Sequence, residues 1–335
     1  MGAGVRARCV QAGPSAASRA DARPGLALLR EAHALLPTHA DAADTLGCAL
    51  AEYGPAEEAV AVLRAAAALA PQAGHEKFMY LGHLLSGAES LEHLRTGVAL
   101  LEAEARRGAP DASASARPDP LRSASAGGER AEAHAALCAG LCSLAEGLLG
   151  EAAESGDVSA AAGEARALLT RAARLDPTSP EPLQALAGLA AEQGQPDEAL
   201  ALLRRSLACW QAEDPSDDAQ LPSPSFEFRL ETAKLLLDCD ESTAAAVRLL
   251  EGLLEEDDSR PEVWHLLALA HHGGCAFGRA RNCLAQARAL LGSLEAAPRE
   301  WLEGELGELE AAVEASAAAW LADGGAAEEE EEEEE

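Results

Sequence analysis

The residues with the clearest capacity for metal chemistry are histidines and a cysteine. The candidates are the pair His83 and His93 and the group His265, His271, His272 and Cys275. Imidazole and thiolate are the usual ligands of zinc. His265 and His272, however, are seven positions apart, which is two helical turns and wide for one metal without another ligand between them. We therefore expect exposed histidines or histidines that line a groove, and no metal site.

Cysteine spacing points away from redox chemistry. The eight cysteines form no C-x-x-C pair. Cys138 and Cys142 are four positions apart, so they would share one face of a helix. We expect these thiols to be small apolar side chains packed between helices, and reduced thiols fit a cytoplasmic or nuclear compartment.

The carboxylates are numerous, but no pair stands out as an acid–base dyad, and no Gly-rich phosphate loop follows a strand. The prediction is therefore a protein that is not an enzyme and needs no cofactor. The run from Glu255 to Asp258 precedes Pro261. It has two interpretations, a solvated turn between helices or an anionic rim for a basic ligand, and the sequence leaves both open.

The formal net charge of −31 limits the class of partner. Nucleic-acid binding depends on Lys and Arg that neutralise phosphates, so no direct nucleic-acid contact is expected. An acidic chain suits a basic protein partner. The charge could instead serve only to keep an Ala-rich chain in solution. No secretory signal and no uninterrupted apolar run of membrane-spanning length is visible, so no membrane partner is predicted.

The elements that must position these side chains are helices. Ala and Leu dominate the 48% of apolar residues, and aromatic residues are only 3%. Ala and Leu are strong helix formers, whereas the aromatic and β-branched residues typical of strands are scarce. The composition favours an all-α fold.

A 34-residue period organises the helices. Pro37 and Pro71 are 34 positions apart, and the residues between them fit a helix–turn–helix repeat. Small residues at two positions would let antiparallel helices approach, and a proline would end the second helix. The pattern resembles the tetratricopeptide family, which implies a right-handed helical solenoid, here of about six repeats. The predicted structural repeat positions are Leu46, Gly47, Ala59, Pro71, Leu81, Gly82, Ala199, Ala246, Trp264 and Ala280.

The repeat array has predicted boundaries. Residues 1–20 are expected to be disordered, and 21–323 to form the solenoid. Within it we expect a disordered insertion at about 107–128, a lengthened turn around 155–159, a polar loop at about 211–224 and a capping helix at about 298–321. Residues 324–335 form an acidic tail, which either contacts the partner or only improves solubility.

In this fold the first helix of each repeat lines a concave groove, which is therefore predicted to be acidic. The predicted partner-binding residues are Asp41, Asp44, Glu52, Glu181, Glu192, Glu231, Asp238, Glu262 and His265. A clamp for the C-terminal carboxylate of heat-shock chaperones would need Lys, Asn and Arg at such positions. Their absence predicts a groove that repels acidic tails.

A narrower resemblance rests on four segments. F-M-Y-L-G-H-L-L-S-G-A-E-S-L-E-H-L-R-T-G-V-A-L-L-E (78–102), P-E-P-L-Q-A-L-A (180–187), E-T-A-K-L-L-L (231–237) and L-L-E-E-D-D-S-R-P-E-V-W-H-L-L-A-L-A (253–270) are similar to the dedicated assembly chaperones of large-subunit ribosomal protein L4. The acidic tail is similar too. The likeness covers residues 24 to 335, whereas the insertion after Arg107 and the heavy Ala content depart from the family pattern.

This resemblance implies a monomeric chaperone in cytoplasm and nucleus. It would bind a newly made basic ribosomal protein, keep it soluble and deliver it to pre-60S assembly. The alternative is a generic tetratricopeptide-repeat scaffold for a multiprotein complex.

Overall fold

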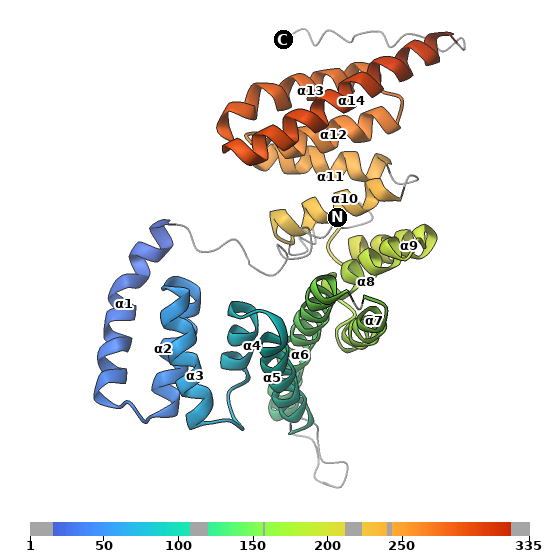
Figure 1. Cartoon of the computed structure of the whole chain (residues 1–335). Coiled ribbons are helices and arrows are strands. Elements are labelled where there is room, and N and C mark those ends of the chain that lie inside the picture. Colours follow the sequence, from blue (N-terminus) through green and yellow to red (C-terminus); the bar gives the residue numbers. More distant parts are fainter. Residues whose placement is uncertain (1–15, 108–119, 157, 212–222, 240–242, 323–335) are drawn as a thin grey trace. The chain divides into compact units, whose positions relative to one another are not determined.

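The computed structural model describes residues 16–107, 120–156, 158–211, 223–239 and 243–322. Within these ranges the regular elements are helices (Figure 1). Their bounds are α1 Ala16–Leu35, α2 Ala40–Tyr53, α3 Ala56–Leu69, α4 His75–Leu84, α5 Gly87–Arg107, α6 Pro120–Ser155, α7 Val158–Leu175, α8 Glu181–Glu192, α9 Pro196–Ala208, α10 Phe226–Asp238, α11 Thr243–Glu256, α12 Pro261–Gly273, α13 Phe277–Leu290 and α14 Ala296–Ala322, with a short 3-10 helix at Leu291–Ser293.

The helices follow one another in pairs, each a first helix and a second helix. Within pairs, α2 packs on α3, α4 on α5, α6 on α7, α10 on α11 and α12 on α13. Between pairs, α3 packs on α4, α5 on α6, α11 on α12 and α13 on α14. The all-α helical-repeat architecture predicted from the 34-residue period is confirmed. The chain divides into two compact units, 1–186 and 187–335, and the boundary falls within α8.

Glycine at the eighth repeat position permits the close approach of the paired helices. A Cβ on Gly47 of α2 would lie 2.5 Å from Cδ2 of Leu63 on α3. A Cβ on Gly82 of α4 would overlap the side chain of Leu94 on α5 in the same way. Leu63 is fully buried and Leu94 nearly so, hence neither can move aside without disturbing the core.

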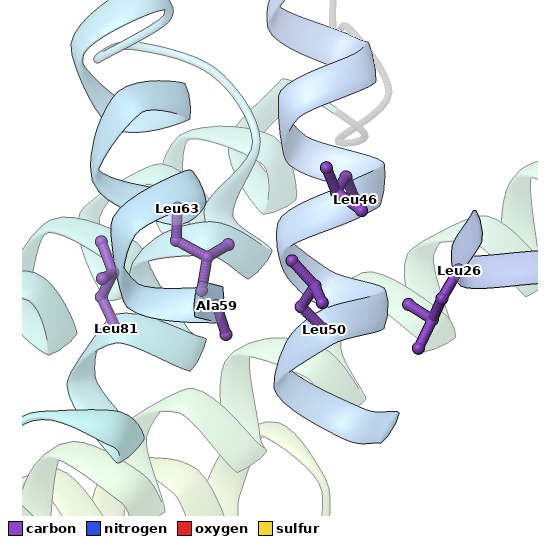
Figure 2. Packing of buried hydrophobic residues seen from close by; sticks show 6 residues of the cluster. All are labelled: Leu26, Leu46, Leu50, Ala59, Leu63 and Leu81. Atoms are coloured by element: carbon purple, nitrogen blue, oxygen red, sulfur yellow. The ribbon is translucent and has the colours of Figure 1, made fainter. Parts of the chain in front are cut away.

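The core of the first unit is built from leucines that meet across helices. Figure 2 shows Leu46 and Leu50 of α2 beside Ala59 and Leu63 of α3. Leu26 of α1 and Leu81 of α4 belong to the same buried cluster. Each helix therefore buries its apolar stripe against both of its neighbours, as a repeat array requires.

The remaining repeat positions differ in burial. Ala59, Ala199, Ala246 and Ala280 have no exposed surface, and Leu46 and Leu81 are buried. Pro71 is exposed just beyond the end of α3. Trp264 is only half-buried, and its indole N–H donates to the carbonyl oxygen of Asp258 at 2.8 Å.

Three predicted boundaries need correction. The predicted bounds of the disordered insertion, 107 and 128, are both wrong, because α5 ends at Arg107 and α6 already begins at Pro120. Proline suits the first helical position and the residues after it are rich in Ala and Ser, with little that excludes a helix. The predicted disorder over 1–20 is wrong from Ala16, where α1 begins. Most of the predicted polar loop and the whole acidic tail fall outside the described residues, so those predictions are not tested. The segments concerned are 1–15, 108–119, 212–222 and 323–335.

The turn after α6 is also shorter than predicted. A lengthened turn around 155–159 is wrong, because α6 ends at Ser155 and α7 begins at Val158. Gly156 has φ +85°, a left-handed conformation that glycine adopts without steric cost. One glycine therefore ends the long helix where the sequence suggested a loop.

Helix α14 covers the end of the second unit, over the residues predicted as a capping helix. Its buried residues recur every three or four positions: Leu302, Leu306, Leu309, Val313 and Ala317. The two tryptophans of the helix lie outside this buried face, because Trp301 is 62% exposed and Trp320 is 46% exposed.

One part of α6 has the composition of a membrane span. Ala131–Ser155 is long and apolar enough to cross a bilayer, with a mean hydropathy of 1.4 in its best window. A core helix passes the same test, and α6 has such a role here, since it packs between α5 and α7. Glu132, Glu146 and Glu151 interrupt the segment. It is weak grounds for a membrane partner.

Candidate binding face

The predicted partner-binding residues lie on the first helices of the repeats. First helices of successive repeats contact each other directly: α2 contacts α4 in the first unit, and α12 contacts both α10 and α14 in the second. We use "first-helix face" for the predicted positions on these helices, taken separately in each unit. The contacts below determine which of those positions remain accessible to a partner.

In the first unit, two carboxylates of α2 form hydrogen bonds with side chains of α4. Asp44 accepts hydrogen bonds from Nζ of Lys77 at 2.8 and 3.0 Å. Glu52 accepts a hydrogen bond from the hydroxyl of Tyr80. Asp44 and Glu52 are therefore engaged between the two helices. Asp41, one turn before Asp44, is exposed.

The electrostatics between α2 and α4 remain negative despite Lys77. Burial raises the pKa of Cys48 to about 12, and the carboxylates of Glu76, Asp44 and Glu52 add to the rise. Sγ of Cys48 lies 4.0 Å from a carboxylate oxygen of Glu76. The raised pKa of Cys48 therefore reflects both its burial and the negative electrostatic potential between α2 and α4, because nearby negative charge opposes formation of the thiolate.

Glu181 and Glu192 lie at opposite ends of α8. Glu181 belongs to the first unit and Glu192 to the second. Burial, followed by the charge of Asp176, raises the pKa of Glu181. Glu192 is exposed at the C-terminal end of the helix. The sequence grouped the two residues, whereas the structure does not place them together.

In the second unit, α10 and α12 carry the other predicted residues. The pKa of Asp238 is raised by burial and then by the negative charge of Glu231. Lys234 offsets Glu231 only partly, because Nζ lies 3.8 Å from the Glu231 carboxylate and 40% of the Lys234 side chain is exposed. Two carboxylates about two turns apart on one helix face thus repel each other, and a bound cation would relieve that repulsion.

Helix α12 contributes one paired and one partly buried residue. Glu262 forms an ion pair with Arg260 at 2.6 Å. Burial lowers the pKa of His265, and the nearby Glu305 of α14 opposes that effect. His265 therefore faces α14 as well as the first-helix face, which reduces its role as a direct partner contact.

Cations are sparse on most of the first helices. Helices α2, α8 and α12 contain no Lys or Arg, and α4 contains only Lys77, whereas α10 contains Arg229 and Lys234. Several guanidinium groups of the other helices pair with carboxylates of neighbouring helices. These pairs are Arg30 with Glu58, Arg64 with Glu89, Arg171 with Glu102, Arg281 with Glu314, and Arg288 with Glu310.

The candidate metal ligands are dispersed. Among the described residues, no three His, Cys, Asp or Glu side chains gather with metal-binding geometry. Nε2 of His272 lies 3.0 Å from Oγ of Ser316 on α14, while His271 is buried and Cys275 is exposed in the turn before α13. Cys138 and Cys142 are both buried in α6.

Comparison with known proteins bears on the repeat itself. The tetratricopeptide repeat family matches residues 152–211, which span α7, α8 and α9, and the packed helix pairs continue on both sides of that match. The fold is a helical-repeat array of the tetratricopeptide type.

Two proteins that are similar to this chain carry the same description. A probable assembly chaperone of rpl4 from Emericella nidulans (strain FGSC A4) is 37% identical over 99 residues, which are 30% of this chain and 25% of the relative. The chain therefore matches about a quarter of that relative's length. The solved structure of an assembly chaperone of RpL4, Acl4 (residues 1–338), gives a TM-score of 0.63 at 25% identity, over 75% of this chain and 90% of that chain.

A third similar structure is more distant. The crystal structure of yeast Tom70 gives a TM-score of 0.42 at 13% identity, over 89% of this chain and 60% of that chain.

Sequence reasoning missed several residues of the candidate binding face. Lys77, Glu76 and Tyr80 complete the α2–α4 contacts, and Glu305 and Ser316 complete the α12–α14 contacts. One signal was available for Lys77, since it lies 33 positions after Asp44, nearly one repeat, and is the sole cation of α4. The α14 residues carried no such signal, because that helix lies beyond the last full repeat.

Proposed function

We propose that this chain is a dedicated assembly chaperone for ribosomal protein L4 of the large subunit. The observation that carries the proposal is the pair of relatives described as assembly chaperones of that protein, one by sequence and one by fold over most of its length. Those relatives favour this function over a generic tetratricopeptide-repeat scaffold. The chain acts by binding a client and performs no catalysis.

The charge distribution supports a basic client. A ribosomal protein that contacts RNA is rich in Lys and Arg, and outside the ribosome its charge attracts stray nucleic acid. First helices that are poor in cations and carry Asp41, Glu192 and Asp238 offer such a client an anionic surface. Attraction of this kind is fast and weakens with added salt, so ribosomal RNA can displace the chaperone without an ATP-driven step.

The remaining parts of the proposal follow from the client. L4 is made in the cytoplasm and assembled in the nucleus, so the chaperone acts in both compartments. The first-helix face binds the client directly. The chaperone contacts neither nucleic acid nor membrane, and it works as a monomer.

Co-expression tests the proposal. L4 expressed alone is expected to precipitate or bind RNA, and L4 expressed with the full chain is expected to stay soluble and co-purify at low salt. High salt should release it. L4 that is equally insoluble with and without the chain, or recovery of only acidic and neutral partners, would reject the chaperone and favour the scaffold.

A further inference from the structure

Trp301 is an exposed aromatic side chain that the packing of α14 does not require. It is 62% exposed, whereas the neighbouring Leu302 begins the buried stripe of the helix and is 2% exposed. Single exposed apolar residues are ordinary, but tryptophan is the residue type most enriched where binding energy concentrates. The surroundings of Trp301 decide which partner it suits.

The direction of α14 relative to α12 indicates where Trp301 lies. Nε2 of His272, near the end of α12, lies 3.0 Å from Oγ of Ser316 on α14. Glu305, earlier on α14, is near enough to His265, earlier on α12, to act on its pKa. Residue numbers therefore rise together, and the two helices run in the same direction. Trp301 is one turn before Glu305 on the same face of α14. It therefore lies toward the start of α12, on the side of α14 that bears the Glu305 carboxylate.

The charge around Trp301 is negative. Glu305 and Glu308 follow it at the four- and seven-residue spacings that share a helix face. Helix α12 has no Lys or Arg, and α14 has only Arg299, two residues before Trp301 and on another side of the helix. An acidic peptide or a second copy of this chain, with its net charge of −31, would be repelled from this surface.

The same region already contains a guanidinium stacked on an aromatic ring. Arg260, which precedes α12, lies 4.5 Å from the centre of the Phe226 ring and forms ion pairs with Glu227 and Glu262. An aromatic face plus carboxylates thus holds an arginine within the chain. Trp301 with Glu305 and Glu308 offers the same combination of an aromatic ring and carboxylates, and within the described part of the chain no arginine forms an ion pair with Glu305 or Glu308.

We propose that Trp301 is a docking platform for an arginine side chain of the basic client, with Glu305 and Glu308 neutralising the guanidinium. Indole is the ring that attracts cations most strongly, and a planar guanidinium stacks on it. The inference rests on the proposed chaperone function and adds a specific anchor to it. A single exposed tryptophan is too small for a stable dimer interface, so a second copy is the less suitable occupant.

The test measures binding of L4 to the full chain and to four variants. Trp301→Ala and Trp301→Leu should each weaken binding about three- to five-fold, the size expected for an exposed cation–π contact, and Trp301→Phe should lie between them and wild type. Trp320→Ala is the matched control, because Trp320 is also exposed but lies near the other end of α14. It should bind as wild type.

Different failures have different meanings. If L4 binds and Trp301→Ala has wild-type affinity, or if Trp301→Leu retains full affinity, the arginine platform is wrong. Self-association of wild type that Trp301→Ala abolishes would show that a second copy is the occupant.

If L4 does not bind wild type, the proposed function fails, and a peptide decides the anchor separately. An alternating Arg-Gly octapeptide should change the tryptophan fluorescence of wild type but not of Trp301→Phe, and a Gln-Gly peptide should change neither. Equal responses of wild type and Trp301→Phe to the Arg peptide would overturn the inference.

Discussion

Lys77 of α4 and Asp44 of α2 form a buried ion pair between the first helices of two successive repeats. The Lys77 side chain has no exposed surface, whereas 26% of the Asp44 side chain remains exposed. Gly74, at φ +70°, begins the turn into α4, and a Cβ there would lie 2.8 Å from Oδ2 of Asp44. The ion pair and the left-handed Gly74 together determine how closely α2 and α4 approach each other.

The ion pair makes Asp44 a stability residue. Asp44→Ala should cost about 3–5 kcal/mol of unfolding free energy, because it leaves the Lys77 ammonium buried without a counter-charge. Lys77→Met should cost less, since Asp44 can still reach water. Urea denaturation measures both, and the double variant Asp44→Leu/Lys77→Met should recover much of the loss. A cost below about 1 kcal/mol for Asp44→Ala would contradict a buried pair.

This pairing also corrects the use of Asp44 as a test of binding. The sequence placed Asp44 among residues that face a partner, beside Asp41. Charge reversal at Asp44 would break a buried pair, so lost binding could reflect lost structure. Asp41 is exposed, so a substitution at Asp41 tests client binding with less risk of disturbing the fold.

The helical repeat was predictable because its signal is local and recurrent. Small residues such as Gly47 and Gly82 recur at one register position, and the structure gives the reason in the overlap that a Cβ would cause with Leu63 or Leu94. The boundaries were less predictable, since Ala- and Ser-rich sequence is compatible with both a loop and the start of α6. Cross-helix pairs such as Asp44 with Lys77 depend on the orientation between repeats, which no single-helix pattern specifies.

The close approach at Gly47 predicts a steric effect with an opposite control. Gly47→Ala should destabilise the chain by about 1–3 kcal/mol, because the buried Leu63 must move. Gly163→Ala, in α7 with no atom within 4 Å of its Cβ position, should instead stabilise by about 0.5–1 kcal/mol through helix propensity. Thermal or urea unfolding separates the two, and a stabilising Gly47→Ala would refute the packing argument.

Burial of Asp238, together with the negative charge of Glu231, predicts that removing the Asp238 charge raises stability. The folded-state pKa of Asp238 is raised, so its unfavourable contribution is present at neutral pH and disappears as the carboxyl is protonated at acid pH. Asp238→Asn should raise stability at pH 7 by up to about 0.5 kcal/mol. That gain should shrink toward about pH 4. Urea midpoints at the two pH values measure it, and a variant less stable than wild type at pH 7 would exclude the repulsion.

Thiol reactivity reports the field between α2 and α4. With a pKa raised to about 12, Cys48 should react with iodoacetamide at pH 8 much more slowly than the exposed Cys275, since the thiolate is the reactive form. Glu76→Gln should speed Cys48 labelling and leave Cys275 unchanged. Mass spectrometry of the labelled peptides follows each site. Cys48 labelling as fast as Cys275 would mean that burial and the carboxylates do not suppress the thiolate.

The central claim is that the first helices attract a basic client. The test compares two triple charge reversals with equal net charge. Asp41→Lys/Glu192→Lys/Asp238→Lys alters first helices and the end of α8, whereas Glu57→Lys/Asp197→Lys/Glu251→Lys alters the second helices α3, α9 and α11. All six carboxylates belong to surface positions, so both variants are expected to fold, and circular dichroism checks this.

The most direct measurement is calorimetric titration of ribosomal protein L4 into wild type and both variants over a range of salt concentrations. The account predicts that wild-type affinity falls steadily with salt, that the second-helix variant follows wild type closely, and that the first-helix variant binds at least about tenfold more weakly at low salt. Equal losses in the two variants, or wild-type binding that does not respond to salt, would contradict it.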